Sequence, residues 1–134
     1  MSGPPRGLLD TTVFIAAESH RALDVAQLPD ESAISVVTIA ELNVGVLAAT
    51  DTEIRARRLA TLNATTDIEV LPIDERVAVV WARLRVQLAE TGRRLNVNDL
   101  WIAATAVANG LPVVTQDADY DALDELGAVT VVRV

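Results

Sequence analysis

Lysine and cysteine are absent from this chain, and histidine occurs once, at His20. The lack of cysteine excludes a disulfide framework and a thiolate metal site, and the lack of lysine excludes every mechanism that needs a lysine amine. No apolar run approaches the roughly 18 residues of a membrane span. Asp10 and Glu18 interrupt the first apolar stretch, where a secretory signal would need continuity. We therefore expect a cytoplasmic protein with no membrane association.

Aromatic residues make up only 3% of the chain, so alanine, valine and leucine must fill the core. The 134 residues are 51% hydrophobic and 22% charged, which predicts one ordered domain over residues 1–134 with a flexible N-terminus at 1–6. All 11 basic residues are arginine, and the net charge is −8. This charge argues against a broad electrostatic grip on nucleic acid, but not against a nucleic acid held locally by metal ions and a few arginines.

Apolar runs that predict strands alternate with segments of helical periodicity. The expected strands cover residues 7–10, 33–37, 69–73, 113–115 and 129–134. The expected helices cover residues 11–17, 19–28, 38–49, 51–64, 74–91, 98–109 and 118–126. Strands that alternate with helices predict an α/β domain with a mainly parallel sheet and helices on both faces.

Acidic residues recur where an expected strand gives way to an expected helix, at Asp10, Glu41, Asp99, Asp117 and Asp119. In a parallel α/β sheet these junctions lie together along the carboxyl edge of the strands. Carboxylates gathered there repel one another and need a cation. Ligation by oxygen alone favours Mg²⁺ or Mn²⁺, and such ions support hydrolysis of phosphodiester bonds by water.

Helix capping is the competing interpretation of each acid taken singly. Thr38-x-x-Glu41 has the form of a capping box, and Asp99 suits the first turn of a helix. Asp10 and Asp117 can act as N-caps. The set of acids is harder to explain by capping, and the two roles are compatible, because a helix N-terminus favours the ionised carboxylate that a hard cation needs.

Four segments, in this order, resemble the motifs of the PIN-domain ribonucleases: Leu9-Asp10-Thr11-Thr12-Val13, Thr38-x-x-Glu41-Leu42, Asn98-Asp99-Leu100-Trp101-Ile102-Ala103-Ala104 and Thr115-x-Asp117-x-Asp119-Tyr120. The similarity is greatest to the VapC toxins of bacterial toxin–antitoxin pairs and extends from residue 7 to residue 134. It implies a three-layer α/β/α domain and an endoribonuclease activity that depends on Mg²⁺ or Mn²⁺. It also implies a homodimer that is inhibited by a VapB-like antitoxin.

The resemblance also implies roles for individual residues. Its catalytic positions are Asp10, Glu41, Asp99 and Asp117, and its metal-binding positions are Asp10, Asp99, Asp117 and Asp119. Whether Asp117 or Asp119 faces the metal stays open, as does the choice between ligand and water-positioning residue for Glu41. Hydroxyl groups that orient a carboxylate, water or phosphate match Thr11, Thr12 and Thr115.

Arginines outside these motifs have two interpretations. Arg93 and Arg94 precede the third motif and are candidates for contact with an RNA phosphate, although loop arginines are more often solvated. Arg55 and Arg57 each follow an acid by four residues, which predicts ordinary intrahelical ion pairs.

Apolar residues raise similar alternatives. Trp81 lies on the apolar stripe of the helix expected at 74–91 and is assigned to the core, whereas Trp101 suits either the core or a dimer contact. Val44 and Leu47 suit either the core or a groove that receives the antitoxin. We expect the contacting antitoxin segment to be cationic, because the acidic site attracts positive charge.

Three other functions compete with this interpretation. A phosphatase that uses Asp10 as a covalent nucleophile needs a second aspartate two residues later, where this chain has Thr12, and normally a lysine. Response-regulator receivers need the same missing lysine. The remaining alternative is a non-catalytic PIN-like protein-interaction module whose acids serve only as caps. The sequence does not identify the RNA, and transfer, ribosomal and messenger RNA all stay open.

Overall fold

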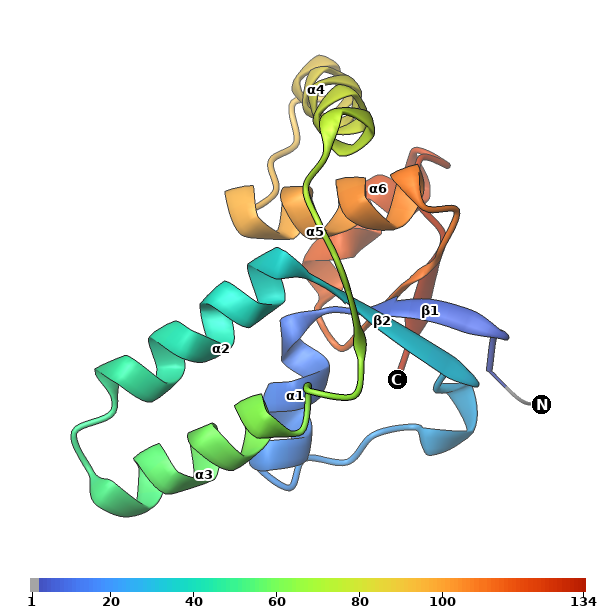
Figure 1. Ribbon diagram of the computed structural model, residues 1–134. Coiled ribbons are helices and arrows are strands. Elements are labelled where there is room, and N and C mark those ends of the chain that lie inside the picture. Colours follow the sequence, from blue (N-terminus) through green and yellow to red (C-terminus); the bar gives the residue numbers. More distant parts are fainter. Residues whose placement is uncertain (1–2) are drawn as a thin grey trace.

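A five-stranded sheet forms the centre of the molecule, and all its strands are parallel (Figure 1). The computed structural model describes residues 3–134. The strand order is β3-β2-β1-β4-β5, with bounds β1 Arg6–Leu9, β2 Glu31–Ser35, β3 Glu69–Leu71, β4 Val113–Thr115 and β5 Val131–Arg133. Leu8 of β1 lies opposite Ala33 on one side and Val113 on the other. The predicted parallel α/β sheet is confirmed.

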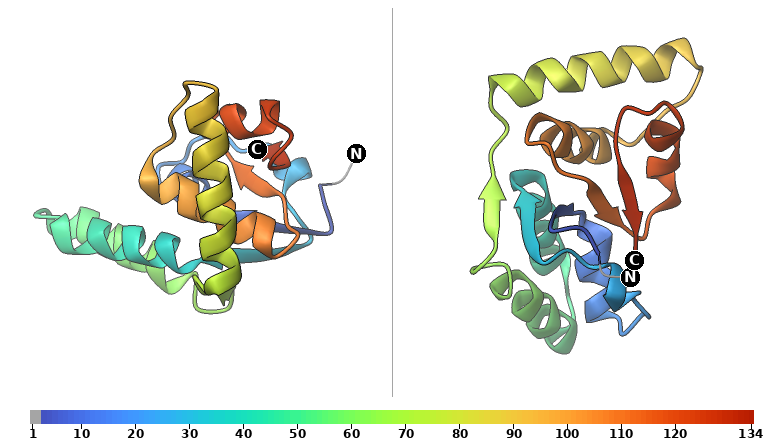
Figure 2. Two further views of the ribbon diagram at one scale, coloured as in Figure 1. Left: turned by 90° about the horizontal axis from the view of Figure 1, so that it is seen from above. Right: turned by 90° about the vertical axis from the view of Figure 1, so that its right-hand side faces the viewer.

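Helices cover both faces of this sheet and complete the predicted three layers (Figures 1 and 2). Helices α4, α5 and α6 lie on one face, and α1 lies on the other, while α2 and α3 form a pair that extends to one side. Their bounds are α1 Thr11–Glu18, α2 Val36–Ala48, α3 Thr52–Asn63, α4 Glu75–Glu90, α5 Val97–Ala108 and α6 Asp121–Glu125. Two short 3₁₀ helices are η1 Val25–Gln27 and η2 Ala118–Tyr120. No helix within residues 3–134 has the length and apolar character that a bilayer crossing requires.

The central strands supply side chains to a hydrophobic core on each face. Leu8 and Val113 belong to the core beneath α4, α5 and α6, whereas their neighbours Leu9 and Val114 belong to the core beneath α1. Successive side chains of a strand point to opposite faces, so strands with two covered faces have unbroken apolar sequence. This is why the strands appear in the sequence as apolar runs without alternation.

Helix α4 packs on α5 through its apolar stripe, whose buried members are Val77, Val80, Leu84 and Leu88. Trp81, beside this stripe, stacks on Trp101 of α5 with 4.8 Å between ring centroids and 18° between planes. Both indoles are half-buried, so Trp81 lies at the edge of the core, and Trp101 packs within this contact. Gly92, at φ +70°, adopts the left-handed conformation just beyond α4, as predicted for the end of this helix.

Two of the predicted elements near the N-terminus were wrong in extent. The helix expected at 19–28 is reduced to η1, because α1 ends at Glu18 and His20 adopts a left-handed φ of 56°. The strand expected at 33–37 ends at Ser35, whose side chain accepts a hydrogen bond from the Val37 amide and caps α2. The chain therefore becomes helical two residues earlier than its β-branched composition suggests.

The segment predicted to be flexible at 1–6 includes the first residue of β1. Residues 1 and 2 lie outside the described residues, and Arg6 already belongs to β1. The carbonyls of Pro4 and Pro5 accept hydrogen bonds from the amides of Asp30 and Glu31, at 3.1 and 2.9 Å. These bonds continue the pairing between β1 and β2 toward the N-terminus.

The ion pair predicted for Arg55 is wrong. Its guanidinium donates instead to the Ala49 carbonyl just beyond the end of α2, and Asp51, the acid four residues earlier, accepts two amides at the start of α3. Arg58 likewise donates to the Gly45 carbonyl, at 2.7 Å. Arg57 forms no ion pair with any residue in the described part of the chain. The Arg55 and Arg58 side chains tie α3 to the C-terminal turns of α2, where carbonyls lack intrahelical donors.

Candidate metal centre

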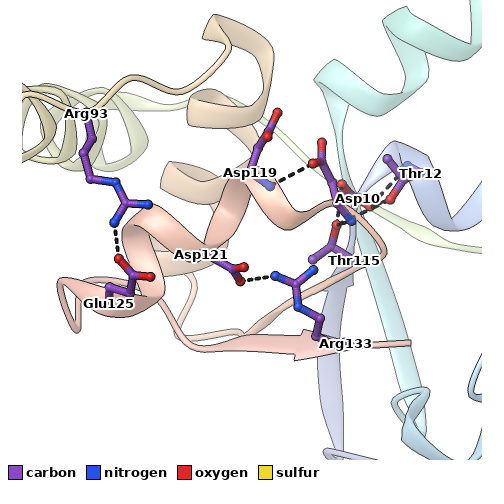
Figure 3. A network of polar contacts seen from close by, with 9 residues as sticks. Asp10, Thr12, Arg93, Thr115, Asp119, Asp121, Glu125 and Arg133 are labelled. Atoms are coloured by element: carbon purple, nitrogen blue, oxygen red, sulfur yellow. Dashed lines mark hydrogen bonds and ion pairs between the residues drawn. The ribbon is translucent and has the colours of Figure 1, made fainter.

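The candidate site lies where β1 and β4 end side by side. The chain proceeds from β1 toward β2 on one side of the sheet, and β4 joins β1 on the other side. A reversal of strand order of this kind opens a crevice at the carboxyl edge of an α/β sheet. Asp10 follows β1 directly, and Thr115 is the last residue of β4. Figure 3 shows the side chains of Asp10, Thr12 and Thr115 turned toward one another at this edge.

Asp10 is held in one orientation by hydroxyl groups from the first turn of α1 and from the end of β4. Its Oδ1 accepts hydrogen bonds from the Thr12 amide and hydroxyl, at 3.1 and 2.6 Å, and its Oδ2 accepts from the Thr115 hydroxyl at 2.9 Å. The Thr12 bond makes Asp10 the N-cap of α1, as the capping interpretation predicted. Asp10 is only 1% exposed. Burial raises its pKa to about 6, although the hydrogen bonds from Thr12 and Thr115 act in the opposite direction.

Glu41 reaches this edge from the interior of α2. Its Oε1 accepts a hydrogen bond from the Thr11 hydroxyl at 2.7 Å, and that hydroxyl lies 3.1 Å from the hydroxyl of Thr38. The capping box proposed for Thr38 and Glu41 is wrong, because Ser35 caps the helix and Thr38 is fully buried in its first turns. The Glu41 carboxylate is therefore free of a capping role.

Asp99 lies in the first turn of α5, as predicted, while Asn96 is the N-cap of that helix. Its Oδ1 accepts a hydrogen bond from the Tyr120 hydroxyl at 3.3 Å. Burial raises the pKa of Asp99 to about 7, and the nearby charges of Asp117, Asp10 and Glu41 contribute to this rise. These three acids act on Asp99 from three other segments of the chain, so the carboxylates form one electrostatic group.

Asp117 and Asp119 complete the group. Asp117 caps η2 by accepting the Asp119 amide at 2.8 Å. One carboxylate oxygen from each of Asp99, Asp117 and Asp119 lies within 4.8 Å of the others, a spacing that can hold a metal ion. Both acids of the fourth motif can therefore contribute oxygen atoms. We call Asp10, Glu41, Asp99, Asp117 and Asp119 the acidic centre.

The acidic centre has no arginine partner in the described part of the chain. Within residues 3–134, none of its five acids forms an ion pair. Arg93 pairs with Glu125 instead, away from Asp10 and Asp119 (Figure 3). Carboxylates that are buried together without a cation shift toward the protonated form, and the raised pKa values of Asp10 and Asp99 follow from this. A divalent cation with oxygen ligands fits the centre and relieves its repulsion.

Two contributors to the site were not identified from the sequence. Tyr120 is fully buried and donates to Asp99, and burial together with the charge of Asp10 raises its pKa, so it stays a neutral donor. A buried tyrosine needs a hydrogen-bond partner. The position of Tyr120 directly after Asp119 was the only sign in the sequence that it belongs to the site. Gln116 donates its backbone amide to the Thr12 hydroxyl at 3.1 Å, which no side-chain pattern reveals.

Comparisons of the sequence and of the structure with known proteins agree with one another. Residues 7–126 match the PIN domain family. Ribonuclease VapC5 of Mycobacterium tuberculosis is 59% identical over 131 residues, which cover 98% of this chain and 97% of that protein. Ribonuclease VapC4 of the same organism is 44% identical over 126 residues, covering 94% and 97%. A crystal structure of a VapBC family member, VapBC-5 from Mycobacterium tuberculosis, superposes with a TM-score of 0.91 at 56% identity, covering 98% of this chain and 100% of that one.

Proposed function

The chain belongs to the PIN-domain family and is a VapC-type ribonuclease of that family, and from this premise we propose that it is the toxin of a toxin–antitoxin pair that cleaves RNA internally. The reaction is hydrolysis of phosphodiester bonds with Mg²⁺ or Mn²⁺. The observation that carries this proposal is the acidic centre, in which Asp99, Asp117 and Asp119 offer oxygen atoms within 4.8 Å of one another. Its acids have no internal cation in the described residues.

We assign the metal-binding role to Asp10, Asp99, Asp117 and Asp119. A bound divalent ion supplies water of lowered pKa and offsets the charge that develops on the phosphate. The chain's contribution is geometry: Thr12 and Thr115 fix Asp10, and Tyr120 donates to Asp99. Glu41, half-buried and oriented by Thr11, is placed to position the attacking water or take its proton.

The partners we propose are an RNA substrate, a second copy of this chain and a VapB-like antitoxin. A cationic antitoxin segment complements the acidic centre and would block it. Val44 and Leu47 are not core residues, since they are 63% and 80% exposed on α2. We propose that these two exposed apolar side chains contact the antitoxin. Arg93 and Arg94 remain candidates for RNA contact, and we place the protein in the cytoplasm.

RNA cleavage by the isolated protein tests this proposal. Total bacterial RNA is incubated with the purified chain, with Mg²⁺, with Mn²⁺ or with chelator, and the ends of the fragments are sequenced. We expect internal cuts only with metal and none with Asp99→Asn. Asp67→Asn, the same change at an exposed turn outside the centre, should cut like the unaltered protein.

The interaction-module alternative rests on a real feature, because Asp10 and Asp117 do cap helices. It predicts that neither metal nor Asp99→Asn changes anything beyond stability. Metal-independent cutting, or an absence of cutting for every RNA, would reject the proposed reaction. Sequencing the fragment ends also identifies the RNA class, since transfer, ribosomal and messenger RNA differ in where unpaired loops occur.

A further inference from the structure

A cleft rich in arginine opens at the C-terminal end of α4 and reaches the first turn of α5, the turn that also carries Asp99. Its volume is about 590 Å³, and its lining includes Arg85, Arg93, Arg94, Leu88, Leu95 and Leu100. That size is within the range of roughly 300–1,000 Å³ that is usual for sites of small organic molecules. No acidic side chain from residues 3–134 lines the cleft. Leu100 directly follows Asp99, so the cleft and the acidic centre share the first turn of α5.

Arg85 is positioned by the tryptophan pair between α4 and α5. Its guanidinium carbon lies 5.6 Å from the centroid of Trp81, which in turn stacks on Trp101. A guanidinium above an aromatic face is oriented by the ring while its N–H groups stay available at its edge. Trp101 lies two residues after Asp99 on the same helix. The stack therefore holds Arg85 against the contact between α4 and α5.

The charge of this cleft is only partly compensated. Arg93 pairs with Glu125, but neither Arg85 nor Arg94 forms an ion pair with any residue from 3 to 134. The cleft thus concentrates positive charge although the chain as a whole carries a net charge of −8. Such a place attracts a polyanion and repels the cationic segment expected of an antitoxin.

We propose that this cleft is a subsite for the RNA strand beside the bond that is cut. Arg85 and Arg94 bind backbone phosphates of flanking nucleotides, and the leucine floor accepts a ribose or base. Guanidinium groups match phosphate oxygens in pairs, and single-stranded RNA combines charged phosphates with apolar ring faces. This inference rests on the proposed ribonuclease function and adds to it a path for the substrate, from the acidic centre across the first turn of α5 to the C-terminal end of α4.

Binding of a non-cleaved RNA tests the subsite separately from catalysis. The full chain, with chelator present to prevent cutting, is titrated into a fluorescein-labelled single-stranded oligouridylate, and anisotropy is followed at several salt concentrations. Arg85→Gln and Arg94→Gln are compared with Arg83→Gln, which removes the same charge from an exposed position of α4 outside the cleft. Thermal unfolding of each variant checks that the fold is kept.

We expect the double variant Arg85→Gln/Arg94→Gln to bind about tenfold more weakly than Arg83→Gln. The slope of log K against log salt should become shallower by about 0.7 for each phosphate of the single strand that the variant no longer binds. A change in folding alone would not alter this slope. With an RNA cut by the unaltered protein, KM should rise while kcat changes less than about twofold, because a flanking contact made equally in ground and transition states affects binding only.

Three results would overturn the subsite. One is equal binding and equal slope for the double variant and Arg83→Gln. The second is equally tight, Arg85-dependent binding of a poly-glutamate of matched charge, which would make the cleft a site for an acidic protein. The third is weakened binding of the antitoxin with RNA binding unchanged. If no RNA is ever cut but the binding difference persists, the ribonuclease function fails and the RNA subsite survives.

Discussion

The two ends of the acidic centre hold their carboxylates in different ways. At the inner end Asp10 is 1% exposed, and both of its carboxylate oxygens accept hydrogen bonds from threonine hydroxyls. At the outer end Asp99, Asp117 and Asp119 are partly exposed or exposed, and their facing oxygens lie within 4.8 Å of one another. The inner acid is fixed before any ligand arrives, whereas the outer acids can adjust to one. We infer that the outer end determines the affinity for the cation. The inner end fixes the orientation of the reacting groups.

Removing one charge from each end gives the largest expected effect. Asp99→Asn should abolish the rise in melting temperature produced by Mn²⁺, because it removes an oxygen of the outer cluster. Asp10→Asn should still show a rise in melting temperature with Mn²⁺, but a smaller rise than the unaltered protein shows. Both variants should cut RNA at least about 10²-fold more slowly, since each loses fixed charge at the reacting centre. Thermal shift titration and cleavage rates measure the two quantities, with Asp67→Asn as control. A Mn²⁺ response lost in Asp10→Asn and kept in Asp99→Asn would reverse the comparison.

Stability without metal should depend on pH at both ends. The folded-state pKa values of Asp10 and Asp99, about 6 and about 7, lie above the ordinary value of 3.8. The native state therefore binds protons more tightly than the unfolded state, and its stability is greatest below the unfolded value. The free energy of unfolding should fall as pH rises from about 4 to about 7. This interval extends from the ordinary pKa of 3.8 to the raised pKa values of Asp10 and Asp99.

Denaturant unfolding with chelator present, over this pH range, measures the effect. Asp10→Asn should be more stable than the unaltered chain at pH 8 by roughly 1–2 kcal/mol, because it removes a buried charge while the fold keeps its shape. The difference should vanish near pH 4. Lower stability of Asp10→Asn at every pH would mean that its capping hydrogen bonds outweigh the repulsion.

Loss of the Thr115 hydroxyl, at the inner end, should lower activity less than loss of an acid does. Thr115→Val removes the donor to Asp10 Oδ2 and the acceptor of the Asp117 amide. We expect roughly tenfold lower kcat/KM, in the range found when groups that orient metal ligands are lost. The pH at half-maximal activity should also rise, because the lost hydrogen bond stabilised the ionised form of Asp10. Thr105→Val, at a buried threonine that bonds only within α5, is the control. Equal loss in both variants would indicate general destabilisation.

The smallest effect is expected at Tyr120, which bonds to the outer end. Tyr120→Phe deletes one hydrogen bond of 3.3 Å to Asp99, worth about 1 kcal/mol, and should slow cleavage about fivefold or less. The same change should raise the pKa of Asp99, since that bond favours its ionised form. Metal affinity measured at pH 6 and pH 8 would report this, with a larger deficit at pH 6. An equal deficit at both pH values would contradict the assignment.

The helix starts at Asp10, Asp99 and Asp117 were predictable from sequence because apolar runs and acidic caps carry local information. Asp10 and Asp117 cap their helices, and Asp99 lies in the first turn of α5. The parallel order of β1 and β4 then brings them to one edge. The convergence of these acids follows from topology, which alternating strands and helices already imply.

Interactions that depend on tertiary contact were not predictable. Glu41 resembles a capping-box residue, but the helix begins at Val36, because Ser35 competes successfully for the cap. Arg55 has an acid four residues earlier, yet its guanidinium bonds to a carbonyl just beyond the end of α2. The tryptophan contact between α4 and α5 depends on how two helices cross. Each of these outcomes was decided by a contact between two elements or by a cap whose geometry the pattern leaves open.

The stacked indoles between α4 and α5 give the molecule its own optical reporter. The chain has two tryptophans, and both are in this stack. Chromophores at this separation couple electronically, so far-ultraviolet circular dichroism, where the strong indole transition absorbs, should carry a paired band that vanishes if the helices part. Because α5 also bears Asp99, this band should report any movement of α5 that accompanies binding at the acidic centre.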